Sequence, residues 1–329
     1  MIRNREIKHS AEKPANRPAA AKIPDAGDGL IVVDKPAGKT SADVVNQIKK
    51  LPGIYKAGHA GTLDPFATGV LICPVNRATR LSRFFLHGNK KYSAVLRLGT
   101  ETDTMDCTGE ITAECDIPEI TREMLSRVAE KFTGRISQVP PAYSALKHKG
   151  TPLYKYARKG TPVEKPARSV EIHSIRITRV EVPEAALEVN CSGGTYIRKL
   201  AADMGSALGC GAHLIRLVRT ESCGFSLDEA VSETDLQSAG TPEDVCRFVI
   251  PMADALRGMQ SYTAGEELAE KISFGRPISV ADIDTSPEAA GSRGSGFIKV
   301  TDTGNRLLAV IEKDENRSGY SYCCVFQSK

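Results

Sequence analysis

The segment GHAGTLDPFATGVLICPV, residues 58–75, places a glycine-containing loop directly before an apolar run. Gly58 and Gly61 allow backbone conformations that other residues avoid, and Pro65 fixes its own φ angle. The apolar run VLICPV (70–75) predicts a strand. Asp64 therefore lies on a constrained loop, from which its carboxylate can project into a cleft.

Asp64 alone does not indicate catalysis, because an Asp-Pro pair in a loop is ordinarily a turn device. No Asp or Glu occurs from Pro65 to Thr100, which argues against a locally built acid–base pair of the glycosidase type, although a distant carboxylate could fold in. The loop lacks the Lys-Ser/Thr of a P-loop, and His59 has neither metal-ligand spacing nor the zinc-deaminase pattern. A single carboxylate suited to nucleophilic chemistry remains.

The residues around this loop predict a mixture of strands and helices. Period-two alternation in KYSAVLRLG (91–99) predicts a half-buried strand. Thr40 or Ser41 is typical of a helix N-cap. The other expected elements are strands at 30–36, 170–182, 186–191 and helices at 78–86, 121–132 and, after a turn, within 193–209.

Charge is unevenly distributed along the chain, although the formal net charge is only +4. Residues 65–100 carry six Lys/Arg and no acid, and residues 147–168 carry seven Lys/Arg against one acid. A charge run is usually a solvated face, but two basic stretches flanking the loop favour a phosphate-binding surface. Residues 225–290 are acidic, with 13 Asp/Glu against four Lys/Arg.

Length and composition suggest two domains in 329 residues. Residues 1–28 are expected to be a disordered basic tail, 29–250 a catalytic domain and 251–329 a small β-rich domain. Within the catalytic domain, residues 138–168 hold five prolines and little periodicity, which predicts a long functional excursion.

The nine cysteines are scattered and form no CxxC pair, so we expect reduced thiols in a cytoplasmic protein and no metal site. The sequence contains no run of about 18 apolar residues, so we expect no membrane span.

Five segments in order resemble the TruB family of tRNA pseudouridine synthases: GHAGTLDPFATGVL (58–71), KYSAVLRLG (91–99), SALKHKGTPLYKYARKG (144–160), GTYIRKLAADMG (194–205) and GAHLIRL (211–217). The resemblance implies an α+β pseudouridine synthase fold, with a mixed, largely antiparallel sheet flanked by helices and loops, and a PUA-like C-terminal domain. It also implies isomerisation of uridine 55 in the tRNA T loop to pseudouridine, with base flipping and without cofactor or metal.

By the same resemblance Asp64 would be the nucleophile, and Arg198 would pair with it and keep it ionised. Tyr92 would be catalytic as well as substrate-binding: its ring would pack against the flipped base and its hydroxyl could relay a proton. Tyr196 and Leu217 would line the uracil pocket.

Further residues would contact RNA around this site. His59 would fill the space that the flipped uridine leaves in the T loop. The insertion at 138–168 would clamp the T arm. The residues expected to contact the RNA backbone are Lys35, Arg80, Lys147, Lys149 and Arg219.

Two positions depart from the family pattern. Asn76 stands where the family commonly has Gly, and Asn tolerates the left-handed backbone. Val218 stands where the family often has the first of two arginines, so one phosphate contact would be missing.

The resemblance leaves alternatives open. A relative that works inside a guide-RNA complex is one, but the long basic insertion favours a stand-alone enzyme, expected to be a monomer with no obligatory protein partner. A non-catalytic RNA-binding protein is another, and a tRNA-folding chaperone role is compatible with the enzyme.

Overall fold

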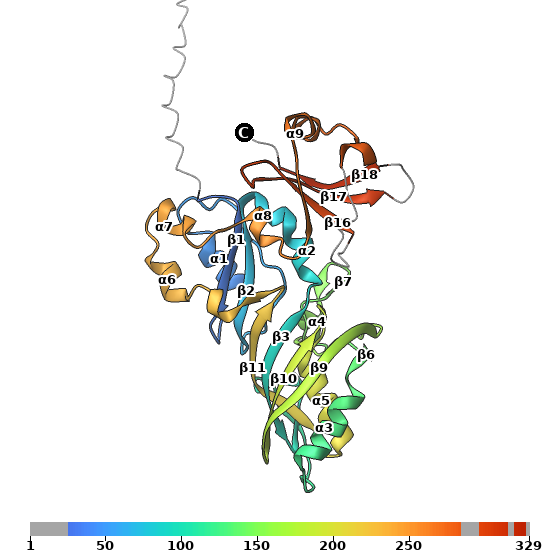
Figure 1. Cartoon of the computed structure of the whole chain (residues 1–329). Coiled ribbons are helices and arrows are strands. Elements are labelled where there is room, and N and C mark those ends of the chain that lie inside the picture. Colours follow the sequence, from blue (N-terminus) through green and yellow to red (C-terminus); the bar gives the residue numbers. More distant parts are fainter. Residues whose placement is uncertain (1–25, 284–295, 315–318, 327–329) are drawn as a thin grey trace, which may run out of the picture.

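The computed structural model describes residues 26–283, 296–314 and 319–326. A nine-stranded sheet dominates it, in the order β13-β1-β2-β11-β3-β10-β9-β6, with β12 paired to β11 (Figure 1). Its pairings are antiparallel except for β2 with β11, which confirms the mixed, largely antiparallel sheet that was expected. The strands are β1 (Gly29–Lys35), β2 (Thr68–Val75), β3 (Lys90–Leu98), β6 (Gly134–Gln138), β9 (Arg168–Glu181), β10 (Glu184–Cys191), β11 (Ala212–Ser222), β12 (Phe225–Ser226) and β13 (Ile250–Pro251).

The alternation in β3 has the expected structural result. Tyr92 and Leu96 are buried, whereas Lys91 between two buried neighbours is exposed. The buried face joins a core to which α3 (Arg122–Lys131) and α5 (Ile197–Leu208) contribute. One face of the sheet is thereby covered by helices, and the start of α5 lies beside the middle of the sheet.

The parallel contact between β2 and β11 requires glycine at position 69. Gly69 pairs with Arg219 at a φ of 101°, and a Cβ there would lie 2.3 Å from the Arg219 carbonyl oxygen. Only glycine accepts both this φ and this approach. The loop 57–65 therefore enters β2 directly beside β11.

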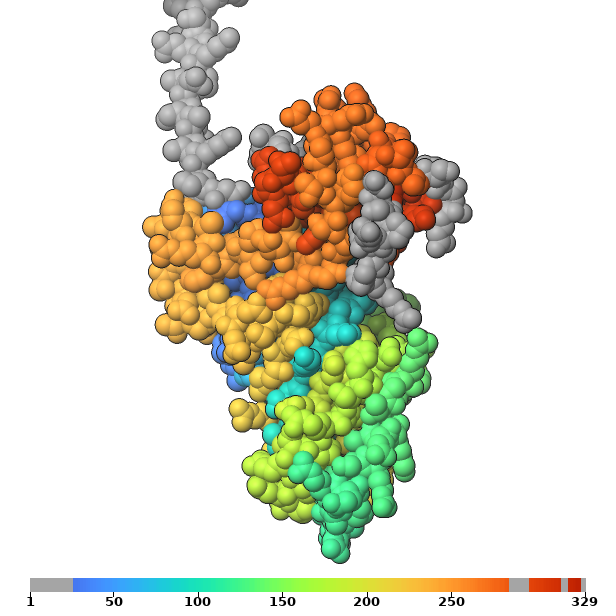
Figure 2. All heavy atoms as spheres, viewed as in Figure 1, coloured from blue at the N-terminus to red at the C-terminus, as the bar shows by residue number. Residues whose placement is uncertain are grey.

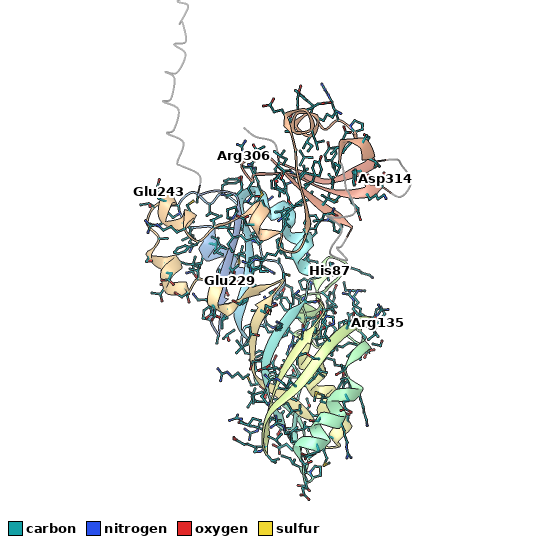
Figure 3. All side chains as sticks on the ribbon, viewed as in Figure 1. His87, Arg135, Glu229, Glu243, Arg306 and Asp314 are labelled. Atoms are coloured by element: carbon teal, nitrogen blue, oxygen red, sulfur yellow. The ribbon has the colours of Figure 1, made fainter. Side chains whose placement is uncertain are left out.

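The remaining helices cover the other end of the sheet. Helix α1 (Ser41–Ile48) has Thr40 as its N-cap, and the Thr40 hydroxyl accepts from the Asp43 N–H. Thr40 was one of the two residues expected to cap this helix. The acidic residues of 233–244 lie at this edge, and Figure 3 shows Glu243 far from Arg135 of β6. The elements are α1 (Ser41–Ile48), α6 (Glu233–Ser238), α7 (Pro242–Cys246) and α8 (Met252–Ala255), with 3₁₀ turns η1 (Asn76–Leu81) and η2 (Leu227–Glu229) and the short helix α2 (Ser82–Leu86).

Five strands near the C-terminus form a second sheet, in the order β14-β16-β17-β18-β15. This agrees with the expected small β-rich domain at the C-terminal end. It packs on η1 and α2, where the rings of Phe84 and Phe297 meet edge to face at 5.2 Å. Figure 2 shows the two parts in contact. The elements are β14 (Gln260–Thr263), α9 (Glu266–Ser273), β15 (Ile278–Ser279), η3 (Val280–Asp282), β16 (Phe297–Thr301), β17 (Leu307–Asp314) and β18 (Gly319–Val325).

Two small hairpins and one short helix lie off the main sheet. The first hairpin follows β3, and the second hairpin and the helix belong to the excursion between β6 and β9. Their bounds are β4 (Thr100–Thr102), β5 (Ile111–Glu114), β7 (Lys147–His148), β8 (Thr151–Pro152) and α4 (Leu153–Ala157).

Ordered structure begins before Gly29. The expectation that residues 1–28 are disordered is therefore wrong for residues 26–28. Ala26 is fully buried, and Asp28 forms an ion pair of 2.6 Å with Arg77. Residues 1–25 lie outside the described residues. Among the described residues, no helix is long and apolar enough to cross a membrane.

Candidate active site

The loop that carries Asp64 is fixed by polar side chains buried beneath it. The Ser41 hydroxyl accepts from the Leu63 N–H at 2.9 Å and donates to the Leu63 carbonyl at 3.2 Å. Arg219 donates from Nε to Val70 O at 2.6 Å and from Nη2 to Gly61 O at 3.2 Å. The loop has few internal hydrogen bonds, so these donors satisfy its carbonyls and hold its shape.

Two expected phosphate contacts are wrong for this reason. Lys35 is fully buried and donates to Pro36 O, Lys39 O and Pro65 O, at 2.8, 2.7 and 3.3 Å. Burial lowers its pKa to about 8. Arg219 is 1% exposed and its guanidinium is bound to loop carbonyls. Both cations are occupied by backbone carbonyls inside the protein, and Arg219 in addition lines the pocket beside Asp64.

Arg80 is exposed, so its expected contact with the RNA backbone stays a prediction, and the structure gives it a further contact. Its Nη1 donates to Val325 O at 2.6 Å, and its guanidinium lies 5.2 Å from the Phe326 ring centroid. The side chain therefore attaches the C-terminal sheet to the catalytic domain. Lys147 and Lys149 are also exposed, on the hairpin of the insertion.

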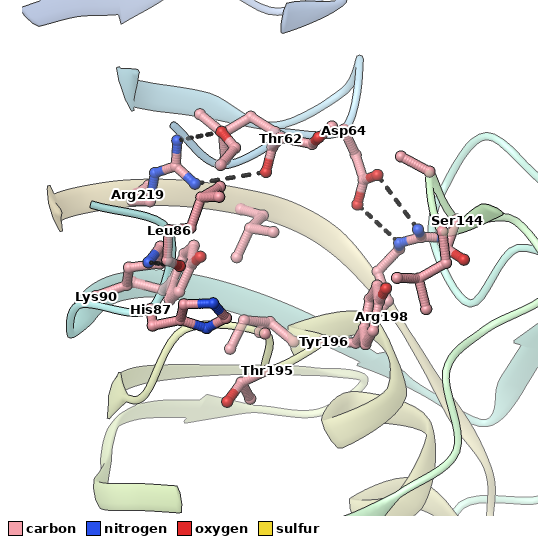
Figure 4. Close-up of a pocket in the computed structure, with 18 residues that line it drawn as sticks. Thr62, Asp64, Leu86, His87, Lys90, Ser144, Thr195, Tyr196, Arg198 and Arg219 are labelled. Atoms are coloured by element: carbon pink, nitrogen blue, oxygen red, sulfur yellow. Dashed lines mark hydrogen bonds and ion pairs between the residues drawn. The ribbon is translucent and has the colours of Figure 1, made fainter. Parts of the chain in front are cut away.

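Asp64 and Arg198 meet as the resemblance implied. Nε of Arg198 lies 2.8 Å from Oδ2 of Asp64, and Nη2 donates to Oδ1 at 3.2 Å (Figure 4). The arginine side chain is 4% exposed and the carboxylate 32% exposed. The pair thus presents a carboxylate to the cleft while the cation stays inside the protein.

Arg198 is held by three further acceptors. Nη1 donates to Thr104 O at 2.7 Å and Nη2 to Tyr143 O at 2.7 Å. Nη1 also lies 3.4 Å from Oδ2 of Asp106, a buried carboxylate bound by the Thr104 and Thr108 hydroxyls. A second carboxylate therefore does fold into the site, but it reaches Asp64 only through the guanidinium.

The pKa of Asp64 is raised above its ordinary value. Burial is the largest cause, the Arg198 guanidinium acts against it, and the charge of Asp106 adds to it. Arg198 thus opposes the protonation of Asp64 without fully offsetting the desolvation.

A cavity of about 370 Å³ opens beside Asp64. Tyr92, Tyr196 and Leu217 all line it, together with Arg198. Burial raises the pKa of both tyrosines, so each remains a neutral phenol at pH 7. The structure therefore brings together the residues that were expected to bind a base.

A second cavity, of about 710 Å³, is also lined by Asp64. His59 lines this cavity and not the first. Burial, aided by the Arg219 charge, lowers the pKa of His59. Its Nδ1 is buried and has no hydrogen-bond partner among the described residues. A neutral imidazole is therefore available to a ligand.

Sequence reasoning missed four residues of the site. Asp106 follows β3 by only a few residues but carries no motif of its own. Gln138 is 2% exposed; its Nε2 donates to Tyr196 O at 3.1 Å and its Oε1 accepts from the Tyr196 N–H at 2.8 Å. Ser144 and Lys90 line the first cavity opposite one another (Figure 4). The only signal was position: Ser144 opens the quoted motif at 144–160, and Lys90 directly precedes the one at 91–99.

The described residues contain no group of three or more His, Cys, Asp or Glu side chains that could hold a metal ion. All nine cysteines are free thiols.

Comparison with known sequences identifies the family. The sequence model described as "TruB family pseudouridylate synthase (N terminal domain)" matches residues 49–197, and that of the "tRNA pseudouridylate synthase B C-terminal domain" matches residues 198–257. Together they span more than half of the chain. The chain belongs to the TruB family.

TruB relatives are similar over most of the chain. A "tRNA pseudouridine synthase B" of Syntrophus aciditrophicus is 44% identical over 75% of this chain and 79% of its own length. One of Geotalea uraniireducens is 49% identical over 63% of this chain and 67% of its own length. As a member of the TruB family, the chain is an isomerase that forms pseudouridine.

The fold also resembles a solved structure of more distant sequence. A chain in the crystal structure of a Cbf5-Nop10-Gar1 complex superposes with a TM-score of 0.70 at 26% identity, over 92% of this chain and 85% of that one. The pseudouridine synthase fold is thereby confirmed.

Proposed function

We propose that this chain converts uridine 55 in the T loop of tRNA to pseudouridine, with Asp64 as the nucleophile. The shared name of its relatives, tRNA pseudouridine synthase B, supports tRNA as the substrate. The observation that carries the site is the Asp64–Arg198 pair at a cavity of about 370 Å³, within the usual range for small-ligand pockets.

The reaction exchanges one bond of the nucleotide for another. The uridine leaves the T-loop stack and its base enters the first cavity. The Asp64 carboxylate bonds to the nucleotide, the N1–C1′ bond breaks and the base rotates. C5 then bonds to C1′, the carboxylate leaves, C5 loses its proton and N1 gains one. Attack at ribose C1′ and attack at uracil C6 both satisfy this balance, and the product is an isomer of the substrate.

The neighbouring residues have distinct roles in this proposal. Arg198 favours the ionised carboxylate and fixes its direction. Tyr92 packs against the base and, as a neutral phenol, can donate a hydrogen bond to it. Tyr196 and Leu217 complete the wall of the base pocket. His59 enters the T loop from the second cavity and offsets part of the unstacking cost.

The insertion at 138–168 clamps the T arm by shape and backbone contacts. Its exposed Lys147 and Lys149 supply charge for RNA phosphates. The acidic edge around α6 and α7 lies on the far side of the molecule from β6 and therefore outside this footprint (Figure 3).

The chain acts alone, as a cytoplasmic monomer, in this proposal. The identity of 44–49% to the bacterial relatives exceeds the 26% to the chain from the Cbf5-Nop10-Gar1 complex. A role in tRNA folding is compatible with the same RNA-binding surface.

Carbodiimide treatment followed by primer extension maps pseudouridine in a tRNA transcript incubated with the purified chain. We expect one new stop, one nucleotide 3′ of position 55, and no stop with Asp64→Asn. A chaperone or a non-catalytic binding protein would give no stop with either form. Modification that requires an added guide RNA would contradict the stand-alone assignment.

A further inference from the structure

The two cavities beside Asp64 share part of their walls. Six residues line both: Thr62, Leu63, Asp64, Ser144, Ala145 and Arg198. These residues form the junction between the cavities. Asp64 and Arg198 contribute charged side chains to the junction, and Thr62 and Ser144 contribute hydroxyls; Figure 4 shows Asp64, Ser144 and Arg198 on one side of the first cavity.

Ser144 has a hydroxyl that the protein does not satisfy. The residue is 5% exposed, and its Oγ makes no hydrogen bond of good geometry with any of the described residues. Its polar neighbour is the Tyr196 hydroxyl: hydrogen bonding from Ser144 acts against the burial that raises the pKa of that tyrosine, but the two groups are not aligned well enough to satisfy the serine. A buried hydroxyl without a partner is unfavourable, so native proteins rarely keep one without a reason. The hydroxyl is therefore available to a ligand at the junction.

The backbone on both sides of Ser144 is fixed. The preceding carbonyl, of Tyr143, accepts from Arg198 at 2.7 Å. The Ser144 carbonyl accepts from the Tyr154 N–H at 3.1 Å, at the start of α4. The backbone that carries the hydroxyl is thus held by Arg198 on one side and by the start of α4 on the other, as a preorganised contact requires.

The part of the substrate that reaches this junction follows from the proposed function, on which this inference rests. With the base in the first cavity and the flanking strand in the second, the sugar of the target nucleotide lies between them. In an internal nucleotide, O3′ and O5′ are esterified, so the 2′-hydroxyl is the only free hydroxyl on the ribose. It both donates and accepts, and it distinguishes RNA from DNA.

We infer that the Ser144 hydroxyl hydrogen-bonds the 2′-hydroxyl of the target nucleotide. Ser144 is thereby a specificity-determining residue for ribose at the reacting position. Its contact also connects the insertion to the sugar on which Asp64 acts.

The test compares two T-arm stem-loops that differ only in carrying uridine or 2′-deoxyuridine at the target position. Affinities are measured with the full chain in an Asp64→Asn background, so that neither RNA is converted. With Ser144 present, we expect the ribose RNA to bind about five- to tenfold more tightly, as one buried hydrogen bond provides. Ser144→Ala should remove most of that ratio by weakening only the ribose RNA.

Ser144→Cys is the matched control, since it keeps the volume but forms weak hydrogen bonds, and it should behave as the alanine variant does. Thermal unfolding of each variant checks the fold. An equal loss of affinity for both RNAs, or no loss for either, would overturn the inference. Pseudouridine formation by the otherwise unmodified chain is measured in parallel. Its absence would refute the proposed function, whereas an unchanged affinity ratio refutes the Ser144 contact alone.

Discussion

Replacing Arg198 by Met is the most informative single perturbation of the site. The change keeps an unbranched side chain of similar length but removes the guanidinium from two carboxylates. Asp106 is 5% exposed and Asp64 32% exposed, so the first loses a buried partner and the second a partly solvated one. Losing one partner of a buried ion pair lowers the free energy of unfolding by about 3–5 kcal/mol. We expect the lower end, about 3 kcal/mol at pH 7, because solvent screens Asp64.

The same variant should change the pH dependence of both stability and activity. Arg198 is the main group that lowers the pKa of Asp64, so its removal raises that pKa further. A carboxyl whose folded pKa lies above its unfolded pKa destabilises the fold when ionised, and the loss is relieved as pH falls through the folded pKa. The stability deficit should therefore shrink from pH 7 to pH 5. The acid limb of kcat/KM should move to higher pH.

Urea unfolding at the two pH values and a pH–rate profile measure these effects. Arg198→Lys is the matched control: it keeps the charge, so the acid limb should return most of the way. The rate of pseudouridine formation should stay low, on the order of 100-fold below wild type. An ammonium group cannot reproduce the two parallel N–H donors with which the guanidinium holds the carboxylate. A Met variant that unfolds at the wild-type urea concentration, with an unmoved acid limb, would refute the reasoning.

Three other changes test separate parts of the account. Gln138→Met removes both hydrogen bonds to the backbone at the start of α5, which should cost about 2 kcal/mol in urea unfolding and lower kcat more than it raises KM; an unchanged kcat would show that this backbone needs no such support. Asp106→Asn removes a charge that raises the pKa of Asp64, so the acid limb should move to lower pH; a shift to higher pH would contradict this. Replacing Lys147 and Lys149 by Ala should reduce the slope of log affinity against log salt by about two, one per phosphate contact; an unaltered slope would place the RNA elsewhere.

Local patterns predicted much of the fold. The alternation in KYSAVLRLG became β3, and the Thr40 cap began α1. Asn76 adopts a φ of 51°, as predicted, and the structure adds a reason for the amide. Its Nδ2 donates to Gly27 O at 2.8 Å and its Oδ1 accepts from the Tyr55 N–H at 3.0 Å. A glycine would allow the turn but would not join these segments.

Buried charges were the main failure of sequence reasoning. Lys and Arg are seldom buried unless paired, so Lys35 and Arg219 seemed suited to phosphates. Their partners are carbonyl oxygens, most of them in the irregular segments 36–39 and 61–65, and a sequence does not show which carbonyls a fold leaves unsatisfied. A clue was present, because an irregular loop held at a fixed shape needs donors from elsewhere.

Long-range geometry accounts for the other omissions. Asp106 reaches Arg198 through a turn in which Met105 takes a φ of 61°, which no local motif predicts. Gln138 and Ser144 are ordinary polar residues until the fold places them against the start of α5 and between two cavities. The candidate nucleophile, Asp64, could be singled out from the sequence, whereas the residues that position it needed the structure.

The central claim, that Asp64 attacks uridine 55, is tested most directly by tritium release. Pseudouridine formation replaces the C5–H bond, so a tRNA transcript labelled at C5 of its uridines releases tritium to water. The full chain should release one equivalent per tRNA, and none from a transcript with cytidine at position 55. Asp203→Asn, which alters a carboxylate paired with Lys199 on α5, is the matched control and should keep full activity.

Asp64→Asn should release no tritium while binding tRNA within about threefold of wild type, because phosphate and shape contacts dominate affinity. Release by that variant at the wild-type rate, or release from the cytidine-55 transcript, would contradict the account.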